Sequence, residues 1–281
     1  MGNVKNMIFV KNYSWIIIKL ILIPFIIISC SSKNIVKTVE KNDMEIYNNA
    51  LSLSLDGNHE KAAIEFDNLN LNYPYSKLSS KAQIMTAYSL YENNEIKKAI
   101  INLQSFLEMN PSGEFSEYAQ YLLAMCYYIQ IPNQERDPSL SKKVINYFKI
   151  LISKYPDGKY AKDAKLKIQY INNILASNEL SIGVFYLRKN SPLAAIKRFK
   201  FVIENYKNTN VIPETLYRLC EALIMIGLEE EAKQSKALLI YNFPQNRWSE
   251  LSKELFNSNI NVIENKTMIT SLKNYIKTIF D

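Results

Sequence analysis

The sequence predicts an all-α fold, a solenoid of about five helix hairpins in two halves, and three observations support it. Glycine is scarce, with six residues in 281, whereas sheet proteins with many tight turns need glycine for positive φ angles. The stretches between turns carry apolar residues at the i, i+3, i+4 and i+7 spacing of amphipathic helices. An Asn/Lys-Tyr/Phe-Pro or Asn-Pro turn recurs, and its copies end at Pro74, Pro111, Pro156, Lys207 (in place of proline) and Pro244.

The residue type also repeats at two positions upstream of each of these turns. Twelve residues before the turn lies a small residue, at Ala62, Ala99, Val144, Ala195 and Ala232. Eight residues before it lies a bulky apolar residue in four copies, at Phe66, Leu103, Phe148 and Phe199, with Lys236 as the exception. A small residue lets two antiparallel helices approach closely, the bulky one fills the space beside it, and proline ends the second helix. One hairpin cannot bury its own apolar face, so the hairpins are expected to stack.

The first 29 residues form a predicted signal segment. Lys5, Lys11 and Lys19 lie before or within an apolar stretch that is too short to span a bilayer. The segment Ile27-Ile28-Ser29-Cys30 resembles a bacterial lipobox, which implies cleavage before Cys30 and attachment of lipid to it. Ser31 in the next position resembles lipoproteins sent to the outer membrane. A secretory signal with an incidental Cys30 is the alternative, and residues 30–42 are predicted to be a tether.

The first helix of each hairpin is expected at Glu45–Leu55, Ser79–Glu92, Ser116–Ile129, Glu179–Lys189 and Glu214–Ile226. A separate linking helix over Ala161–Leu175 divides three N-terminal hairpins, residues 43–160, from two C-terminal hairpins in residues 161–248. An insertion, Ile131 to Leu140, contains Arg136-Asp137-Pro138, with Asp137 as a plausible N-cap and Pro138 at the first helical position. Residues 249–281 form a tail whose apolar stripe over Thr267–Phe280 predicts a capping helix.

These repeats resemble the tetratricopeptide repeat, because small, turn, aromatic and proline positions recur in its order. In the first unit those positions are Ala50, Gly57, Ala62, Phe66 and Pro74. The lipobox, five repeats, the Arg136-Asp137-Pro138 insertion and the linking helix together resemble the BamD family of lipoproteins of the outer-membrane β-barrel assembly machine, over about residues 30–248. The resemblance implies a periplasm-facing, lipid-anchored adaptor of the outer membrane that catalyses no reaction.

Its implied partners are the periplasmic domains of the barrel-forming subunit, other assembly lipoproteins, and unfolded outer-membrane proteins recognised through an aromatic-ended C-terminal signal. The groove positions of the repeat hold a set of tyrosines suited to a half-wet groove, with Lys81 available for the peptide carboxylate. These tyrosines are Tyr47, Tyr88, Tyr91, Tyr118, Tyr121 and Tyr128. Ordinary packing between helices is the alternative for each of them. Arg218 and Glu221, with Glu229–Glu231, are candidates for partner binding, and a solvated charged surface is the alternative there.

Composition argues against several other classes of function. The net charge is +7, but residues 1–29 hold three lysines and no acid, and the rest shows no basic cluster that would indicate nucleic acid. With His59 as the sole histidine, a histidine-based metal cluster has little room, and we expect no cofactor beyond the lipid on Cys30. Cys126 and Cys220 are predicted to be buried free thiols. Another envelope repeat lipoprotein, scaffolding peptidoglycan or polysaccharide machinery, remains the alternative function.

Overall fold

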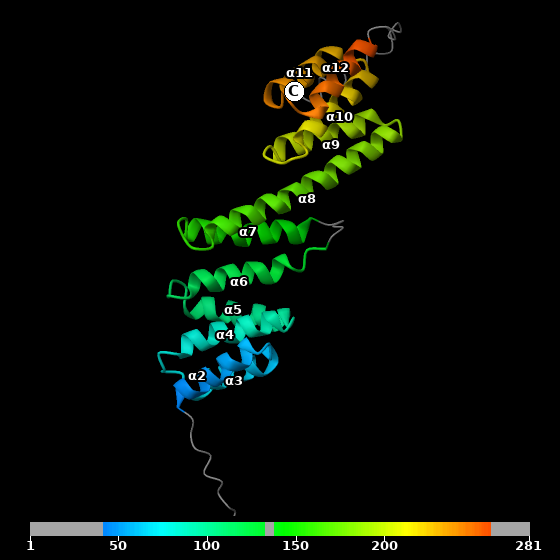
Figure 1. The fold of residues 1–281 in the computed structure, drawn as a ribbon. Coiled ribbons are helices and arrows are strands. Elements are labelled where there is room, and N and C mark those ends of the chain that lie inside the picture. Colours follow the sequence, from blue (N-terminus) through cyan, green and yellow to red (C-terminus); the bar gives the residue numbers. More distant parts are fainter. Residues whose placement is uncertain (1–41, 133–137, 260–281) are drawn as a thin grey trace, which may run out of the picture. The chain divides into compact units, whose positions relative to one another are not determined.

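The computed structural model describes residues 42–132 and 138–259, and all regular secondary structure in those ranges is helical (Figure 1). The helices are α2 (Asp43–Leu55), α3 (His59–Asn72), α4 (Ser79–Glu92), α5 (Ile96–Met109), α6 (Ser116–Tyr128), α7 (Ser139–Lys154), α8 (Ala161–Arg188), α9 (Pro192–Asn205), α10 (Ile212–Met225), α11 (Glu229–Asn242) and α12 (Arg247–Asn259). The all-α prediction is therefore confirmed. Residues 1–45 and 46–281 are two separate compact units, and the first is described only over residues 42–45.

In the second unit each helix packs mainly against the helices next to it in the chain. Contacts follow chain order from α3 to α11, and α12 packs on α10 and α11. Most helices span 13 to 16 residues, which is three to four turns. The hairpins α4/α5, α6/α7 and α10/α11 correspond to predicted repeats, and the later part of α8 pairs with α9. Residues 46–55 pack on α3 through Ala50 and Phe66 in one core cluster.

The repeated small and bulky positions form the core, as predicted. All five small residues, from Ala62 to Ala232, are fully buried, and so are Phe66, Leu103, Phe148 and Phe199. Burial of a large apolar side chain contributes about 1.5–3 kcal/mol, so each of these four bulky residues stabilises the hairpin that holds it. In the fifth hairpin Lys236 replaces the bulky residue, and its ammonium lies 4.5 Å from the ring centre of Phe256 on α12.

Helix α8 corrects the predicted division of its segment into two separate helices. A linking helix and a separate first helix of the fourth hairpin were expected, but Ala161–Arg188 is one continuous helix of 28 residues. The reason is that Ala176-Ser177-Asn178, between the two expected helices, contains neither proline nor glycine to end a helix. Gly183 allows α8 to approach α9, since a Cβ atom there would lie 2.3 Å from Cε1 of Phe199.

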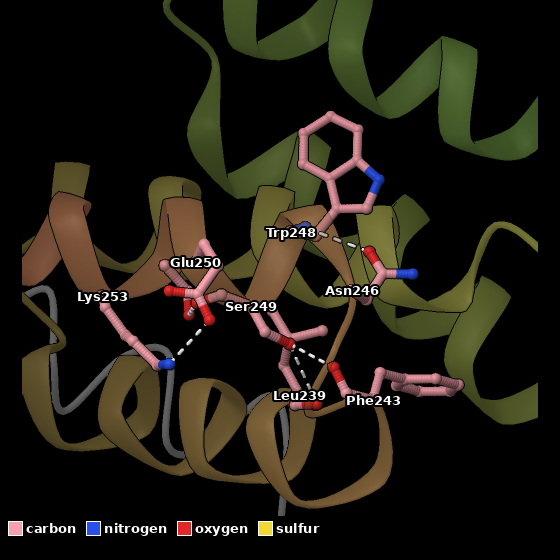
Figure 2. A network of polar contacts seen from close by, with 8 residues as sticks. Leu239, Phe243, Asn246, Trp248, Ser249, Glu250 and Lys253 are labelled. Atoms are coloured by element: carbon pink, nitrogen blue, oxygen red, sulfur yellow. Dashed lines mark hydrogen bonds and ion pairs between the residues drawn. The ribbon is translucent and has the colours of Figure 1, made fainter.

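Helix α12 is a second difference from the prediction. The tail was expected to start at residue 249, with its capping helix only over 267–280, but α12 already begins at Arg247. The turn before α12 is closed by side chains (Figure 2). Asn246 Oδ1 accepts a hydrogen bond from the Trp248 N–H at 3.0 Å, and the Ser249 hydroxyl donates to the Phe243 carbonyl at 2.7 Å. Helix α12 thus covers the last hairpin through its contacts with α10 and α11.

Several predictions fall on residues outside the described ranges, namely Cys30 with the signal and tether, Arg136 and Asp137, and the helix expected over 267–280. Pro138 is described: it precedes α7, which begins at Ser139, one residue later than expected. Within the described ranges, no helix combines the length and the hydropathy that a bilayer crossing requires.

Candidate functional site

Five of the six predicted groove tyrosines lie on α4 and α6 and are half-buried: Tyr88, Tyr91, Tyr118, Tyr121 and Tyr128. With Tyr160, in the turn before α8, they make up what we call the tyrosine face. Tyr160 joins the set through its ring, which stacks on Tyr121 with centroids 4.6 Å apart and lies 5.4 Å from Tyr118. The tyrosine face therefore extends from α4 across α6 to the start of α8.

Hydrogen bonds hold the α6 and α8 sides of this face together. The Tyr121 hydroxyl donates to Asp163 Oδ2 at 2.7 Å, and the Tyr160 backbone N–H donates to Glu117 Oε1 at 3.1 Å. Because both acceptors are carboxylates, these are charge-assisted bonds, which are stronger than bonds between neutral groups. The Tyr121 ring is consequently fixed at its edge by Asp163 and on its face by Tyr160.

The electrostatics of the tyrosine face follow from burial and from nearby acids. Burial raises the pKa of Tyr118, and Tyr160 and Tyr88 add to the effect. Burial also raises the pKa of Tyr121, with the Asp163 carboxylate as the next cause. Burial and then Glu92 raise the pKa of Tyr88. These hydroxyls therefore stay neutral at neutral pH and can act as hydrogen-bond donors.

A lysine and an aspartate border the face at Tyr128. The Lys167 ammonium lies 5.0 Å from the centre of the Tyr128 ring and 3.5 Å from Asp163 Oδ2. The Tyr128 ring also packs edge-on against the core residue Phe148, with centroids 6.3 Å apart. The face is thus apolar in its rings and polar at its edges, and it carries both signs of charge.

Tyr47 does not have the exposure that a groove-lining residue needs. It is 6% exposed, belongs to a core cluster and packs edge-on against Phe66 at 5.5 Å. Tyr47 is therefore an ordinary packing residue, because its ring fills space between residues 46–55 and α3. Lys81 is exposed at the surface, and its ammonium lies 4.9 Å from the centre of the Tyr47 ring.

The predicted partner-binding pair lies on α10, next to α12. Arg218 donates to Glu221 at 2.8 Å and lies 3.4 Å from Glu214, so two carboxylates of its own helix balance its charge. Its guanidinium also lies 5.2 Å from the centre of the Trp248 ring and 5.4 Å from that of Tyr217. Arg218 and Glu221 are half-buried rather than freely solvated, which gives them a defined geometry.

The two described cysteines are buried free thiols, as predicted. Burial raises the pKa of Cys126 and of Cys220 to about 12, so both stay protonated and unreactive at neutral pH. Among the described residues no group of three or more His, Cys, Asp or Glu side chains is placed to hold a metal ion. What this surface offers is binding through aromatic rings, hydroxyls and paired charges.

The contributions of Tyr160, Asp163 and Lys167 were missed from the sequence. Groove positions were assigned only to the first helix of each hairpin, whereas these residues belong to the start of α8. A signal was present, because the turn at Pro156 leads to Ala161 as the turns at Pro74 and Pro111 lead to Ser79 and Ser116. The start of α8 therefore occupies the place of the first helix of a repeat.

Comparison with known proteins gives consistent matches over most of the chain. A family model described as "YfiO: Outer membrane lipoprotein" matches residues 39–238. A Caulobacter vibrioides protein named "Outer membrane protein assembly factor BamD" is 40% identical over 203 residues, which are 72% of this chain and 67% of that protein. A Rickettsia prowazekii protein of the same name is 36% identical over 229 residues, 82% of this chain and 91% of that protein. A solved thermophilic tetratricopeptide-repeat protein of Thermus thermophilus aligns with a TM-score of 0.35 and 16% identity, covering 79% of this chain and all of that one.

Proposed function

Because the chain belongs to the YfiO family of outer membrane lipoproteins, we propose that it is a lipid-anchored scaffold subunit of the outer-membrane β-barrel assembly machine. Relatives at 36–40% identity are named as outer membrane protein assembly factors, and this is the observation that carries the proposal. The fold is an all-α tetratricopeptide-repeat solenoid, and the chain is a scaffold, not an enzyme. Its contribution to assembly is binding and orientation of other proteins.

In this role the lipid anchor and the tyrosine face have separate tasks. Cys30 carries the lipid and holds the protein at the periplasmic side of the outer membrane. The tyrosine face, with Lys81, receives the aromatic-ended C-terminal signal of an unfolded outer-membrane protein. Tyrosine rings offer an apolar surface with a polar tip, which suits a bound chain that remains partly hydrated.

Arg218 and Glu221 are proposed to contact the periplasmic domains of the barrel-forming subunit. Their support is geometric: the Arg218 guanidinium is half-buried and held between two carboxylates and two aromatic rings. Arginine and tryptophan in such positions are typical of the residues that dominate interface energies. A partner carboxylate could compete for the guanidinium, which has five N–H donors.

Co-purification from solubilised outer membrane tests the proposed role. An affinity-tagged full-length chain is expected to recover the barrel-forming subunit, and Arg218→Ala is expected to reduce that recovery at least about tenfold, since truncating an interface arginine costs on the order of 2 kcal/mol. Arg198→Ala is the matched control, because Arg198 also forms an ion pair, with Glu179 at 2.9 Å, but on α9. Recovery of peptidoglycan enzymes without any barrel-forming subunit would refute the role.

A further inference from the structure

A surface groove of about 520 Å³ lies between α3 and α5, with α4 behind it. The apolar part of its lining is made by Ala63 and Ile64 of α3, Leu90 of α4 and Ile101 of α5. Those two isoleucines are 55% and 67% exposed, although both are large apolar side chains. This groove shares no lining residue with the tyrosine face.

The two exposed isoleucines occupy equivalent repeat positions, two residues after the small residues Ala62 and Ala99. The other three hairpins have polar residues at this position: Asn146, Lys197 and Gln234. The fold of the repeat therefore does not require an apolar side chain there. An exposed apolar pair confined to the first two hairpins indicates a surface that something covers.

The groove is acidic in a protein that is basic. Its lining holds three carboxylates, Glu60, Asp67 and Glu95, and one lysine, Lys98, whereas the whole chain has a net charge of +7. Lys98 is paired with Glu95, the residue before α5. No ion pair to Glu60 or Asp67 is formed among the described residues, although Lys98 also interacts electrostatically with Glu60. With three carboxylates and one ammonium, the lining keeps a net negative charge.

Asn102 adds an unused hydrogen-bond acceptor to the lining. Its Oδ1 atom is buried, and no described residue donates to it. A buried acceptor without a partner costs free energy, and an N–H donor supplied by a ligand would remove that cost. One kind of ligand, a peptide with apolar and basic side chains, matches the exposed isoleucines, the net negative charge and the acceptor without a partner.

We propose that the groove between α3 and α5 is a docking site for a peptide segment of a partner protein in which apolar residues alternate with lysine or arginine. The apolar side chains pack between Ile64 and Ile101. The basic side chains pair with Glu60 and Asp67, and an N–H group donates to Asn102. This site is independent of the proposed role of the tyrosine face and of Arg218.

Fluorescence anisotropy on the full chain tests the site with two short labelled peptides, one of leucine and lysine and one with glutamate in place of every lysine. We expect the lysine peptide to bind at least about tenfold more tightly than the glutamate peptide, because the groove carries net negative charge. The double variant Ile64→Asn with Ile101→Asn should weaken binding of the lysine peptide about tenfold. Asparagine is chosen because Asn146 occupies this position in the third hairpin.

The control is Lys197→Asn, the same repeat position in the fourth hairpin, which should bind like the unmodified chain. Asp67→Lys should reduce the preference for the lysine peptide without loss of helical circular dichroism. Equal binding of the two peptides, or full binding by the double isoleucine variant, would overturn the proposal. It is also overturned if gel filtration shows self-association that the double isoleucine variant abolishes, because a second copy would then be the occupant.

Discussion

Tyr121 and Tyr88 show that one residue type has two roles within the tyrosine face. Tyr121 is stacked on Tyr160 and bonded to Asp163, so its ring is held in one place. The Tyr88 ring meets the His59 ring edge-on, with centroids 6.5 Å apart, and packs at the margin of the core. We therefore expect Tyr121 to shape the face and Tyr88 to be available to a bound peptide.

Replacing Tyr88 with alanine should accordingly weaken crosslinking to a peptide with the C-terminal sequence of an outer-membrane barrel protein several-fold. The physical reason is the loss of a ring contact worth about 0.5–1.5 kcal/mol. The measurement is photocrosslinking yield with a peptide that ends in phenylalanine, at matched protein concentration, with helical circular dichroism recorded in parallel.

Tyr241→Ala is the control, because Tyr241 is 85% exposed and lies on α11 in the C-terminal part of the chain. Its substitution should leave crosslinking unchanged. Undiminished crosslinking of the Tyr88 variant would show that the peptide does not contact this part of the face. Tyr121→Phe separates the two roles, since it keeps the ring but removes the hydroxyl that donates to Asp163.

At the scale of the element, a left-handed residue ends the first helix of four hairpins. Gly57 and Gly227 have φ angles of +76° and +72°, and Asn94 and Asn190 take the same place at +60° and +55°. In each case the next N–H reaches back to a carbonyl five residues earlier, as in the 2.8 Å bond from Asn58 N to Leu53 O. These are Schellman turns, and asparagine replaces glycine in two of them. The low glycine content is therefore compatible with repeated left-handed turns.

Gly57→Ala should destabilise the protein by about 1–2 kcal/mol, the cost of a Cβ atom in the left-handed region. Space is not the cause, because nothing lies within 4 Å of a Cβ atom at this position. Gly57→Asn should cost less, since asparagine already serves at the equivalent Asn94 and Asn190. Urea denaturation measures both effects. If alanine and asparagine were equally tolerated, backbone strain would not be what limits this turn.

Most elements were predictable from the sequence, because a small residue, a bulky residue and a turn proline recur at the same spacing in most hairpins. Ser79–Glu92 was predicted residue for residue, and the predicted end of the first helix, Leu55, is also observed. The continuity of α8 was not predicted, since the repeat alignment placed a break at Ala176-Ser177-Asn178, which contains no residue that ends a helix. Helix α12 was missed because Asn246, its capping residue, follows a turn treated as the end of the repeats.

The candidate site was less predictable than the fold, for a reason that particular residues make clear. Repeat position identified Tyr88, Tyr91, Tyr118, Tyr121 and Tyr128 as candidates, and all five are half-buried on α4 and α6. Repeat position could not distinguish Tyr47 from the groove tyrosines, because its burial comes from packing against Phe66. It also could not find Asp163, because a hydrogen bond between residues 42 positions apart depends on how α6 and α8 pack.

At the scale of the whole second unit, each helix depends mainly on its neighbours in the chain. Among the residues that the structure describes, no single core spans it: Phe66 and Phe199 belong to different clusters that share no buried residue. In such a repeat protein stability is approximately a sum of local terms and nearest-neighbour terms. Local opening is therefore expected to differ along the chain.

Phe66→Ala should cost about 3–5 kcal/mol locally. We expect it to speed amide hydrogen exchange in residues 46–92 while exchange in α10 to α12 stays as in the unmodified chain. Phe199→Ala should act in the opposite way, on α8 to α11. Hydrogen exchange read by mass spectrometry measures both variants. Uniformly faster exchange throughout the chain in either variant would mean that the unit unfolds as one cooperative block.

A serine follows three of the repeat turns, and this bears on how the chain could be lengthened. Ser79, Ser116 and Ser249 each lie five residues after a turn proline, are buried, and donate across the turn to Asn70 Oδ1, the Asn110 carbonyl or the Phe243 carbonyl. The junction after the fifth hairpin thus has the same serine-to-carbonyl hydrogen bond as the junction after the second, whereas the serine after the first donates to a side chain. By this criterion helix α12 corresponds to the first helix of a sixth repeat. A copy of a hairpin could therefore be inserted at the turn after Pro244 without a new kind of hydrogen bond across that turn.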